Sequence, residues 1–79
     1  MITVLFFGPV AELVGASRLQ AAHQPGMRLQ DLRDSLSVQH AEAFARVSLA
    51  AIDGEHVRDM SMPLADGSEV VFMSKFSGG

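Results

Sequence analysis

Apolar residues fill nearly every position of two short segments, one near each end of the chain. Residues 2–7 read Ile-Thr-Val-Leu-Phe-Phe before Gly8-Pro9, and residues 69–73 read Glu-Val-Val-Phe-Met. β-Branched and aromatic residues favour strands, and a Gly-Pro pair ends them. The pattern predicts two buried strands.

Each of these strands carries one polar residue, Thr3 or Glu69, which marks the side facing away from the core. Because successive side chains of a strand point to opposite faces, the residues of the other parity are predicted to point into the core: Ile2, Val4, Phe6, Val70 and Phe72. Four apolar residues share the outward side: Leu5, Phe7, Val71 and Met73. If the strands are neighbours, these four form one patch of the kind that usually marks a partner interface, unless loops fold back over them.

The middle of the chain predicts one main helix and a hairpin. Leucines at positions 29, 32 and 36 recur at helical spacing and indicate an amphipathic helix over residues 28–39, although no usual capping residue precedes it. Residues 49–52, Asp53-Gly54 and residues 55–57 have the pattern of a strand, a primed turn and a strand. A weaker strand is expected over residues 17–22, after a helical turn over residues 10–14 that Gly15 closes. The order predicts an α+β domain, with one helix packed across one face of a sheet.

Composition limits the chemistry. The 79 residues include no cysteine and carry a net charge of −3, and 48% of them are hydrophobic, as in a single domain spanning residues 1–79. The six Lys and Arg residues are scattered, so nucleic acid is not an expected partner, and residues 2–7 are too short for a membrane span. The three histidines are far apart, and the acidic residues near Asp53 belong to a turn, so no metal site is expected. The absence of cysteine fits the cytoplasm.

The chain ends in Gly78-Gly79, and this end is its most distinctive chemical feature. A carboxylate on two glycines can enter a narrow channel because neither residue has a Cβ. We therefore expect residues 74–79 to form a flexible tail whose terminal group reacts in a partner enzyme. The alternative is an inert, frayed end.

Four segments carry a family resemblance. They are Leu5-Phe6-Phe7, Glu12-Leu13-Val14-Gly15, the run Pro-Leu-Ala-Asp-Gly-Ser-Glu-Val over residues 63–70, and Ser77-Gly78-Gly79. In this order the sequence resembles the small subunit of molybdopterin synthase, and it shares part of the pattern with the thiamin sulfur carrier. The resemblance implies a ubiquitin-like β-grasp fold, with a mixed sheet and one main helix packed across one face.

The resemblance also implies a function. In that family a ubiquitin-activating-like adenylyltransferase uses ATP to activate the C-terminal glycine, here Gly79, which becomes a thiocarboxylate. The tail, here Phe76, Ser77 and Gly78, then threads into the large subunit of a heterotetrameric cytoplasmic complex, where sulfur passes to precursor Z (cyclic pyranopterin monophosphate). The chain itself is then no enzyme and binds no cofactor or metal, and its outward residues Leu5, Phe7, Val71 and Met73 meet the large subunit.

Two positions depart from the family pattern. Ser74-Lys75 stands where a Pro-Pro pair is common, and Ala11 stands where arginine is frequent. A sulfur carrier or ubiquitin-like modifier for another pathway, such as thiamin, and a non-catalytic β-grasp interaction module therefore remain alternatives.

Overall fold

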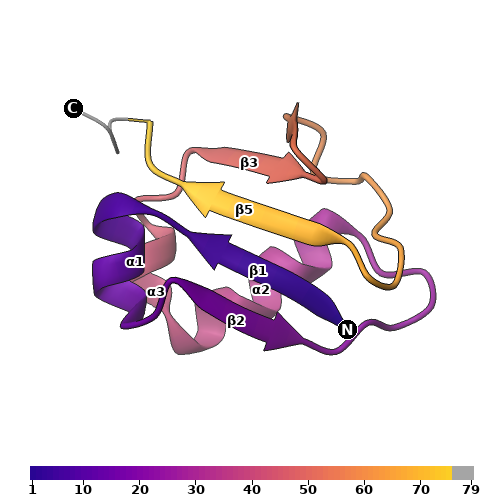
Figure 1. Cartoon of the computed structure of the whole chain (residues 1–79), viewed down its shortest axis with the longest axis horizontal. Helices are drawn as coiled ribbons and strands as arrows, with labels where there is room; N and C mark the ends of the chain where they lie inside the picture. The colour runs from indigo at the N-terminus through magenta and orange to yellow at the C-terminus, as the bar shows by residue number, and fades with distance from the viewer. Residues whose placement is uncertain (76–79) are drawn as a thin grey trace.

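A five-stranded mixed sheet forms the body of the computed structural model, which describes residues 1–75. The strands lie side by side in the order β2-β1-β5-β3-β4 (Figure 1). Only β1 and β5 are parallel; the other neighbours are antiparallel. The strand bounds are β1 (Ile2–Phe6), β2 (Arg18–Ala21), β3 (Leu49–Ile52), β4 (Glu55–Val57) and β5 (Glu69–Met73).

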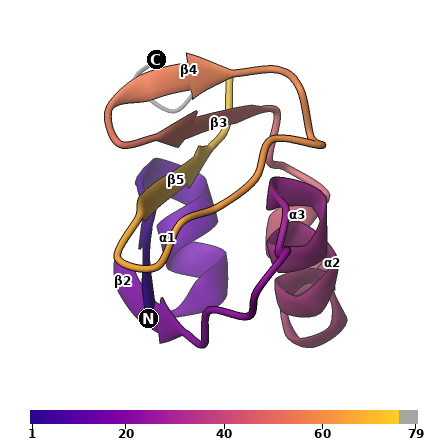
Figure 2. The same cartoon turned by 90° about the vertical axis from the view of Figure 1, so that its right-hand side faces the viewer.

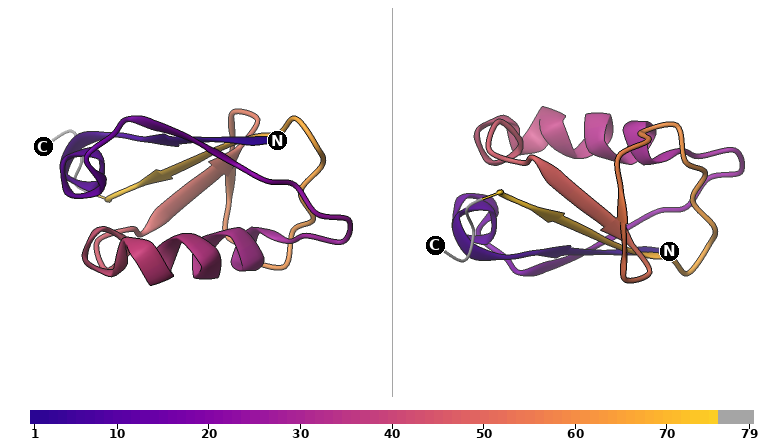
Figure 3. Two further views of the ribbon diagram at one scale, coloured as in Figure 1. Left: turned by 90° about the horizontal axis from the view of Figure 1, so that it is seen from below. Right: turned by 90° about the horizontal axis from the view of Figure 1, so that it is seen from above.

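Three helices pack against this sheet within the described residues. They are α1 (Gly8–Val14), α2 (Leu29–Gln39) and α3 (Ala41–Phe44). The main helix α2 lies across one side of the sheet, and within residues 1–75 no helix lies over the opposite side (Figures 2 and 3). This arrangement confirms the α+β class and the main helix, whereas the short α3 was not predicted. None of the helices in the described residues is long and apolar enough to cross a membrane.

The two central strands pack as the alternation predicts. Val4 pairs with Val70, Phe6 pairs with Phe72, and all four side chains are fully buried, as is Ile2. The inward set predicted from Thr3 and Glu69 is thereby confirmed.

Three phenylalanine rings form the centre of the core. The Phe44 ring meets the Phe72 ring edge-on with centroids 5.1 Å apart, and it meets the Phe6 ring at 6.1 Å. The Phe6 and Phe72 rings lie 6.5 Å apart and closer to parallel. Such pairs contribute roughly 0.5–1.5 kcal/mol beyond the area that they bury. Because Phe44 comes from α3, this short helix joins the helical layer to the sheet.

The β3–β4 hairpin turns at Asp53-Gly54, as predicted. Both residues have positive φ, 49° and 87°, which a primed turn requires. The Asp53 carboxylate accepts a hydrogen bond from the Glu69 N–H at 2.9 Å, and the Asp53 N–H donates to the Glu69 carbonyl at 2.8 Å. The turn therefore also holds the start of β5.

The first turn of α2 is capped by a distant loop. The N–H groups of Leu29 and Gln30 donate to the carbonyls of Met62 and Met60, at 2.9 and 2.8 Å. The Asp31 carboxylate accepts the Arg28 N–H at 2.9 Å. These contacts satisfy backbone donors at the helix start and explain how α2 begins without Ser, Thr, Asp or Asn before Leu29.

The loop that caps α2 also contains Asp59 and Ser61, and the contacts between these two residues make the stability of the protein depend on pH. The Asp59 carboxylate accepts hydrogen bonds from the Ser61 hydroxyl at 2.6 Å and from the Ser61 N–H at 2.9 Å. These bonds, with a smaller contribution from the charge of Arg28, lower the pKa of Asp59. Because the folded pKa lies below the unfolded value of about 3.9, the contribution to stability is present above that value and is lost as the pH falls through the folded pKa.

We therefore expect Asp59→Asn to lower the Tm at a pH of about 7 and the difference from wild type to shrink towards a pH of about 2. Thermal melts of both proteins across this pH range measure the effect. If the two proteins differed in Tm by the same amount at both ends of this pH range, the prediction would be wrong.

Candidate functional site

The face of the sheet opposite α2 carries an apolar patch at the end where β5 leads towards the C-terminus. Leu5 of β1 pairs with Val71 of β5, and Val71 pairs in turn with Ala51 of β3. Met73 pairs with Leu49 beside them. We call these residues the outer patch: Leu5, Leu49, Ala51, Val71 and Met73.

The structure brings together three of the four predicted interface residues directly. Leu5, Val71 and Met73 are half-buried on neighbouring strands. Register adds the half-buried Leu49 and the buried Ala51 behind them, whose strand partners could not be read from local pattern.

Phe7 lies beyond the strand to which it was assigned. β1 ends at Phe6, and Phe7 is the residue that precedes α1, with extended backbone and 50% of its surface exposed. Pro9 in the first turn favours a helix that begins at Gly8, so Phe7 precedes the helix and the strand ends one residue earlier than predicted. Phe7 is thus a large exposed apolar side chain next to the end of β1.

Polar residues occupy the other end of the same face. Thr3 pairs with Glu69 on one side and with Gln20 on the other, and the Gln20 side-chain amide donates to the Thr3 hydroxyl at 3.2 Å. The outward side of the sheet is therefore divided into a polar half and an apolar half. The apolar half lies at the end from which the C-terminal segment departs.

The segment after β5 begins against the body of the protein. Ser74 is half-buried, and the Lys75 N–H donates to the Ser48 hydroxyl at 2.7 Å. The other tail residues singled out in the sequence, Phe76, Ser77, Gly78 and the reactive Gly79, lie outside the described residues.

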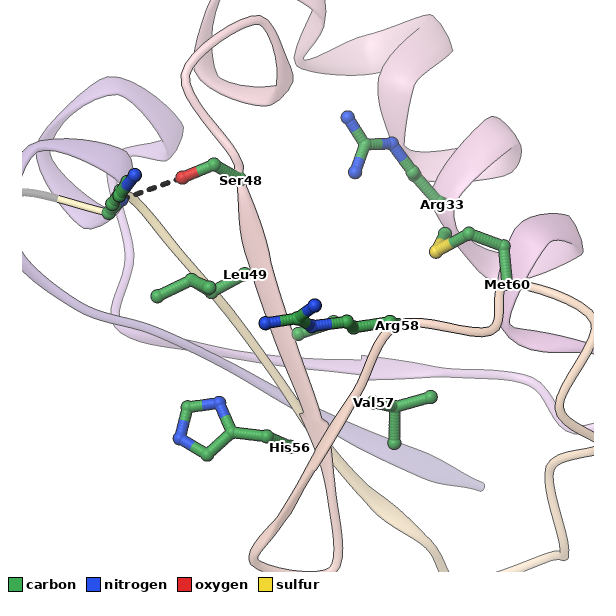
Figure 4. A pocket seen from close by; sticks show the side chains of 9 residues that line it. Arg33, Ser48, Leu49, His56, Val57, Arg58 and Met60 are labelled. Atoms are coloured by element: carbon green, nitrogen blue, oxygen red, sulfur yellow. Dashed lines mark hydrogen bonds between the residues drawn. The ribbon is translucent and has the colours of Figure 1, made fainter.

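A groove beside this segment was missed by the sequence analysis. Its volume is about 680 Å³, and the side chains lining it include Arg33, His56, Arg58 and Lys75 (Figure 4). They come from three separate parts of the sequence, Arg33 of α2, the pair His56 and Arg58, and Lys75, and only the fold brings these parts together.

The three histidines lie in different parts of the fold. The His23 ring nitrogen Nε2 lies 2.8 Å from the Leu64 carbonyl, His40 follows the last residue of α2, and His56 lines the groove. Within residues 1–75, no three His, Asp or Glu side chains are placed so that they could hold a metal ion.

Comparisons with known proteins extend over the whole chain. The pattern of the ThiS family matches residues 4–79. The molybdopterin synthase sulfur carrier subunit of Escherichia coli K12 is 32% identical over an alignment 87 positions long, gaps included, which covers all of both chains.

Two solved structures are similar in fold. SAMP1 of Haloferax volcanii has a TM-score of 0.81 at 19% identity, with 99% of this chain and 98% of that chain covered. In Helicobacter pylori, the complex of subunits 1 and 2 of molybdopterin-converting factor includes a chain with a TM-score of 0.73 at 22% identity, covering 99% of this chain and 97% of that one. These neighbours and the sheet order confirm the ubiquitin-like β-grasp fold. With a family match through the last residue and a relative aligned from end to end, the chain belongs to the ThiS family and is related to the small subunit of molybdopterin synthase.

Proposed function

We propose that this protein is a cytoplasmic sulfur carrier in the biosynthesis of the molybdenum cofactor. Its identity of 32% with the sulfur carrier subunit of Escherichia coli molybdopterin synthase, over the full length of both chains, carries the proposal. The sulfur is held as a thiocarboxylate on Gly79, the last residue of the family match. The acceptor is precursor Z.

The chemistry needs a leaving group at the terminal carboxyl. A Gly79 carboxylate oxygen attacks the α-phosphorus of ATP on an adenylyltransferase and releases pyrophosphate, which leaves an acyl adenylate. Hydrosulfide then attacks the acyl carbon and displaces AMP; a persulfide donor gives an acyl disulfide, from which a thiol releases the same thiocarboxylate. Activation makes the carboxyl carbon a better electrophile, so the carrier contributes the reacting group while its partners contribute the catalysis.

The outer patch supports docking on a large subunit. In this proposal Leu5, Val71 and Met73, together with the exposed Phe7, pack against that subunit and bring the tail to its channel. Support comes from the position of these residues, at the end of the sheet from which the C-terminal segment departs. The Helicobacter pylori neighbour was solved in a complex of subunits 1 and 2, which supports the same kind of assembly.

Intact mass spectrometry tests the proposal. After incubation with the adenylyltransferase, ATP and a sulfur donor, we expect the mass to rise by the difference between one sulfur and one oxygen. Omitting ATP is the matched control and should leave the mass unchanged. Adding the large subunit and precursor Z should then return the chain to its original mass.

The outcomes separate the alternatives. A chain that never gains sulfur would contradict sulfur carriage and favour an interaction module. A chain that gains sulfur but does not lose it to precursor Z would place its acceptor in another pathway.

A further inference from the structure

Most of the positively charged side chains of this acidic protein lie together, around Ser48 and Lys75. The net charge is −3, yet four of the six Lys and Arg residues line two adjoining cavities that share Ser48 and Lys75. The second cavity has a volume of about 400 Å³. Among the described residues, no Asp or Glu lines either cavity. The four cations are Arg33, Arg46, Arg58 and Lys75.

No Asp or Glu side chain of the described residues pairs with these four cations. Within residues 1–75, the side chains of Arg46, Arg58 and Lys75 make no hydrogen bond or ion pair. Arg33 is held in place, since its guanidinium donates to the Phe44 carbonyl at 3.4 Å and lies 6.0 Å from the centroid of the Phe44 ring. The aspartates all accept hydrogen bonds elsewhere: Asp31, Asp34, Asp53, Asp59 and Asp66.

The larger cavity combines three of these cations, Arg33, Arg58 and Lys75, with an apolar floor. Leu49, Val57 and Met60 line it between the charged side chains. In Figure 4 the Arg58 side chain lies across β3 towards Leu49, and Arg33 projects from the side of α2. We call this cavity the basic groove. It offers burial for an apolar side chain and ionic contacts around that side chain.

We propose that the basic groove is a docking site for an acidic segment of a partner protein, in which carboxylates flank an apolar residue. A free inorganic anion would pair with the cations but leave the apolar floor in water. A purely apolar ligand would cover the floor and leave the cations unpaired. A nucleic acid would meet the overall negative charge of the chain along most of its length.

This site is separate from sulfur transfer. It does not require the thiocarboxylate, and it shares only Leu49 with the outer patch. It gives the protein a second recognition surface at the β3–β4 edge of the sheet.

An NMR titration of the ¹⁵N-labelled chain tests the proposal. The probe is the synthetic peptide Asp-Glu-Leu-Asp-Glu with blocked ends, and the control peptide is Asn-Gln-Leu-Asn-Gln. We expect saturable shifts at Val57, Arg58 and Met60 with the acidic peptide only, and we expect added NaCl to weaken binding because the contacts are ionic.

Charge reversal locates the site. Arg58→Glu should raise the Kd at least about tenfold, whereas Arg18→Glu, the same change on the exposed opposite edge strand, should leave it within about a factor of two. The ¹⁵N spectrum reports whether each variant folds, and Arg58→Gln removes the charge without reversing it.

Three results would overturn the proposal: no saturable shift, equal effects of Arg58→Glu and Arg18→Glu, or displacement of the peptide by an equal concentration of inorganic phosphate. The last result would identify a site for small anions instead. None of these results bears on the sulfur test, since no sulfur is transferred in the titration.

Discussion

A chain lacking Gly79 is expected to fold as the full chain does and to transfer no sulfur to precursor Z. The core residues of the described part of the chain lie between Ile2 and Phe72, so we expect the deletion to leave their packing unchanged. It moves the terminal carboxyl back by one residue, about 3.5 Å along an extended chain. Misplacement by about 1 Å can cost about 100-fold in rate, so we expect loss of transfer by at least that factor.

Intact mass and single-turnover conversion of precursor Z measure this loss, and thermal melts measure the fold. A chain extended by one serine after Gly79 is the matched control for length, and it should be equally inactive. Gly78→Val keeps the terminal carboxyl in place but adds a branched Cβ, so it should slow threading and leave the melt unchanged. Transfer at the wild-type rate by the shortened chain would contradict the assignment of Gly79.

Two adjacent residues of β5 are expected to respond in opposite ways to the same substitution. Phe72→Glu should unfold the domain, because the side chain is fully buried and its ring contacts two other phenylalanine rings. Truncating a buried phenylalanine costs about 3–5 kcal/mol, and a buried unpaired carboxylate adds to this cost. Met73→Glu should remain folded, because this half-buried side chain lies on the open face and can reach water.

Melts separate the two variants, and calorimetry with the large subunit tests the interface. In the proposed complex Met73→Glu places a charge against an apolar partner surface and should raise the Kd at least about tenfold, or about 1.4 kcal/mol. Phe6→Glu and Leu5→Glu repeat the comparison on the neighbouring strand. Wild-type affinity of both Met73→Glu and Leu5→Glu would place the interface elsewhere.

Local patterns predicted the strands and which side of each central strand points into the core. The last strand has the predicted bounds, Glu69–Met73, because an apolar run rich in β-branched and aromatic residues lies between a glycine-containing turn and polar residues. The hairpin followed from Asp53-Gly54, and Gly15 ends α1 in the left-handed conformation. The outward placement of Leu5, Val71 and Met73 followed from one polar residue in each strand.

Contacts between distant segments could not be read in this way. The strand order and the cap of α2 by Met60 and Met62 depend on pairings that no local pattern encodes. Phe44 joins the core from a helix of four residues, which is too short to show a period. The basic groove was missed for the same reason, since Arg33, Arg58 and Lys75 are scattered in sequence and meet only after folding.

The parallel pairing of β1 with β5 affects when the domain can form during synthesis. Thr3 pairs with Glu69, so the inner part of the sheet joins segments from near the two ends of the chain. Contacts at such long sequence separation slow folding, because the intervening loop must close first. A nascent chain that ends after β4 can form only the separate strand pairs β2-β1 and β3-β4, because β5 is the strand that joins them, and it cannot complete its core until β5 emerges. Folding therefore finishes only as the residues next to the tail leave the ribosome, and an activating partner that selects folded domains would meet no unfinished chain.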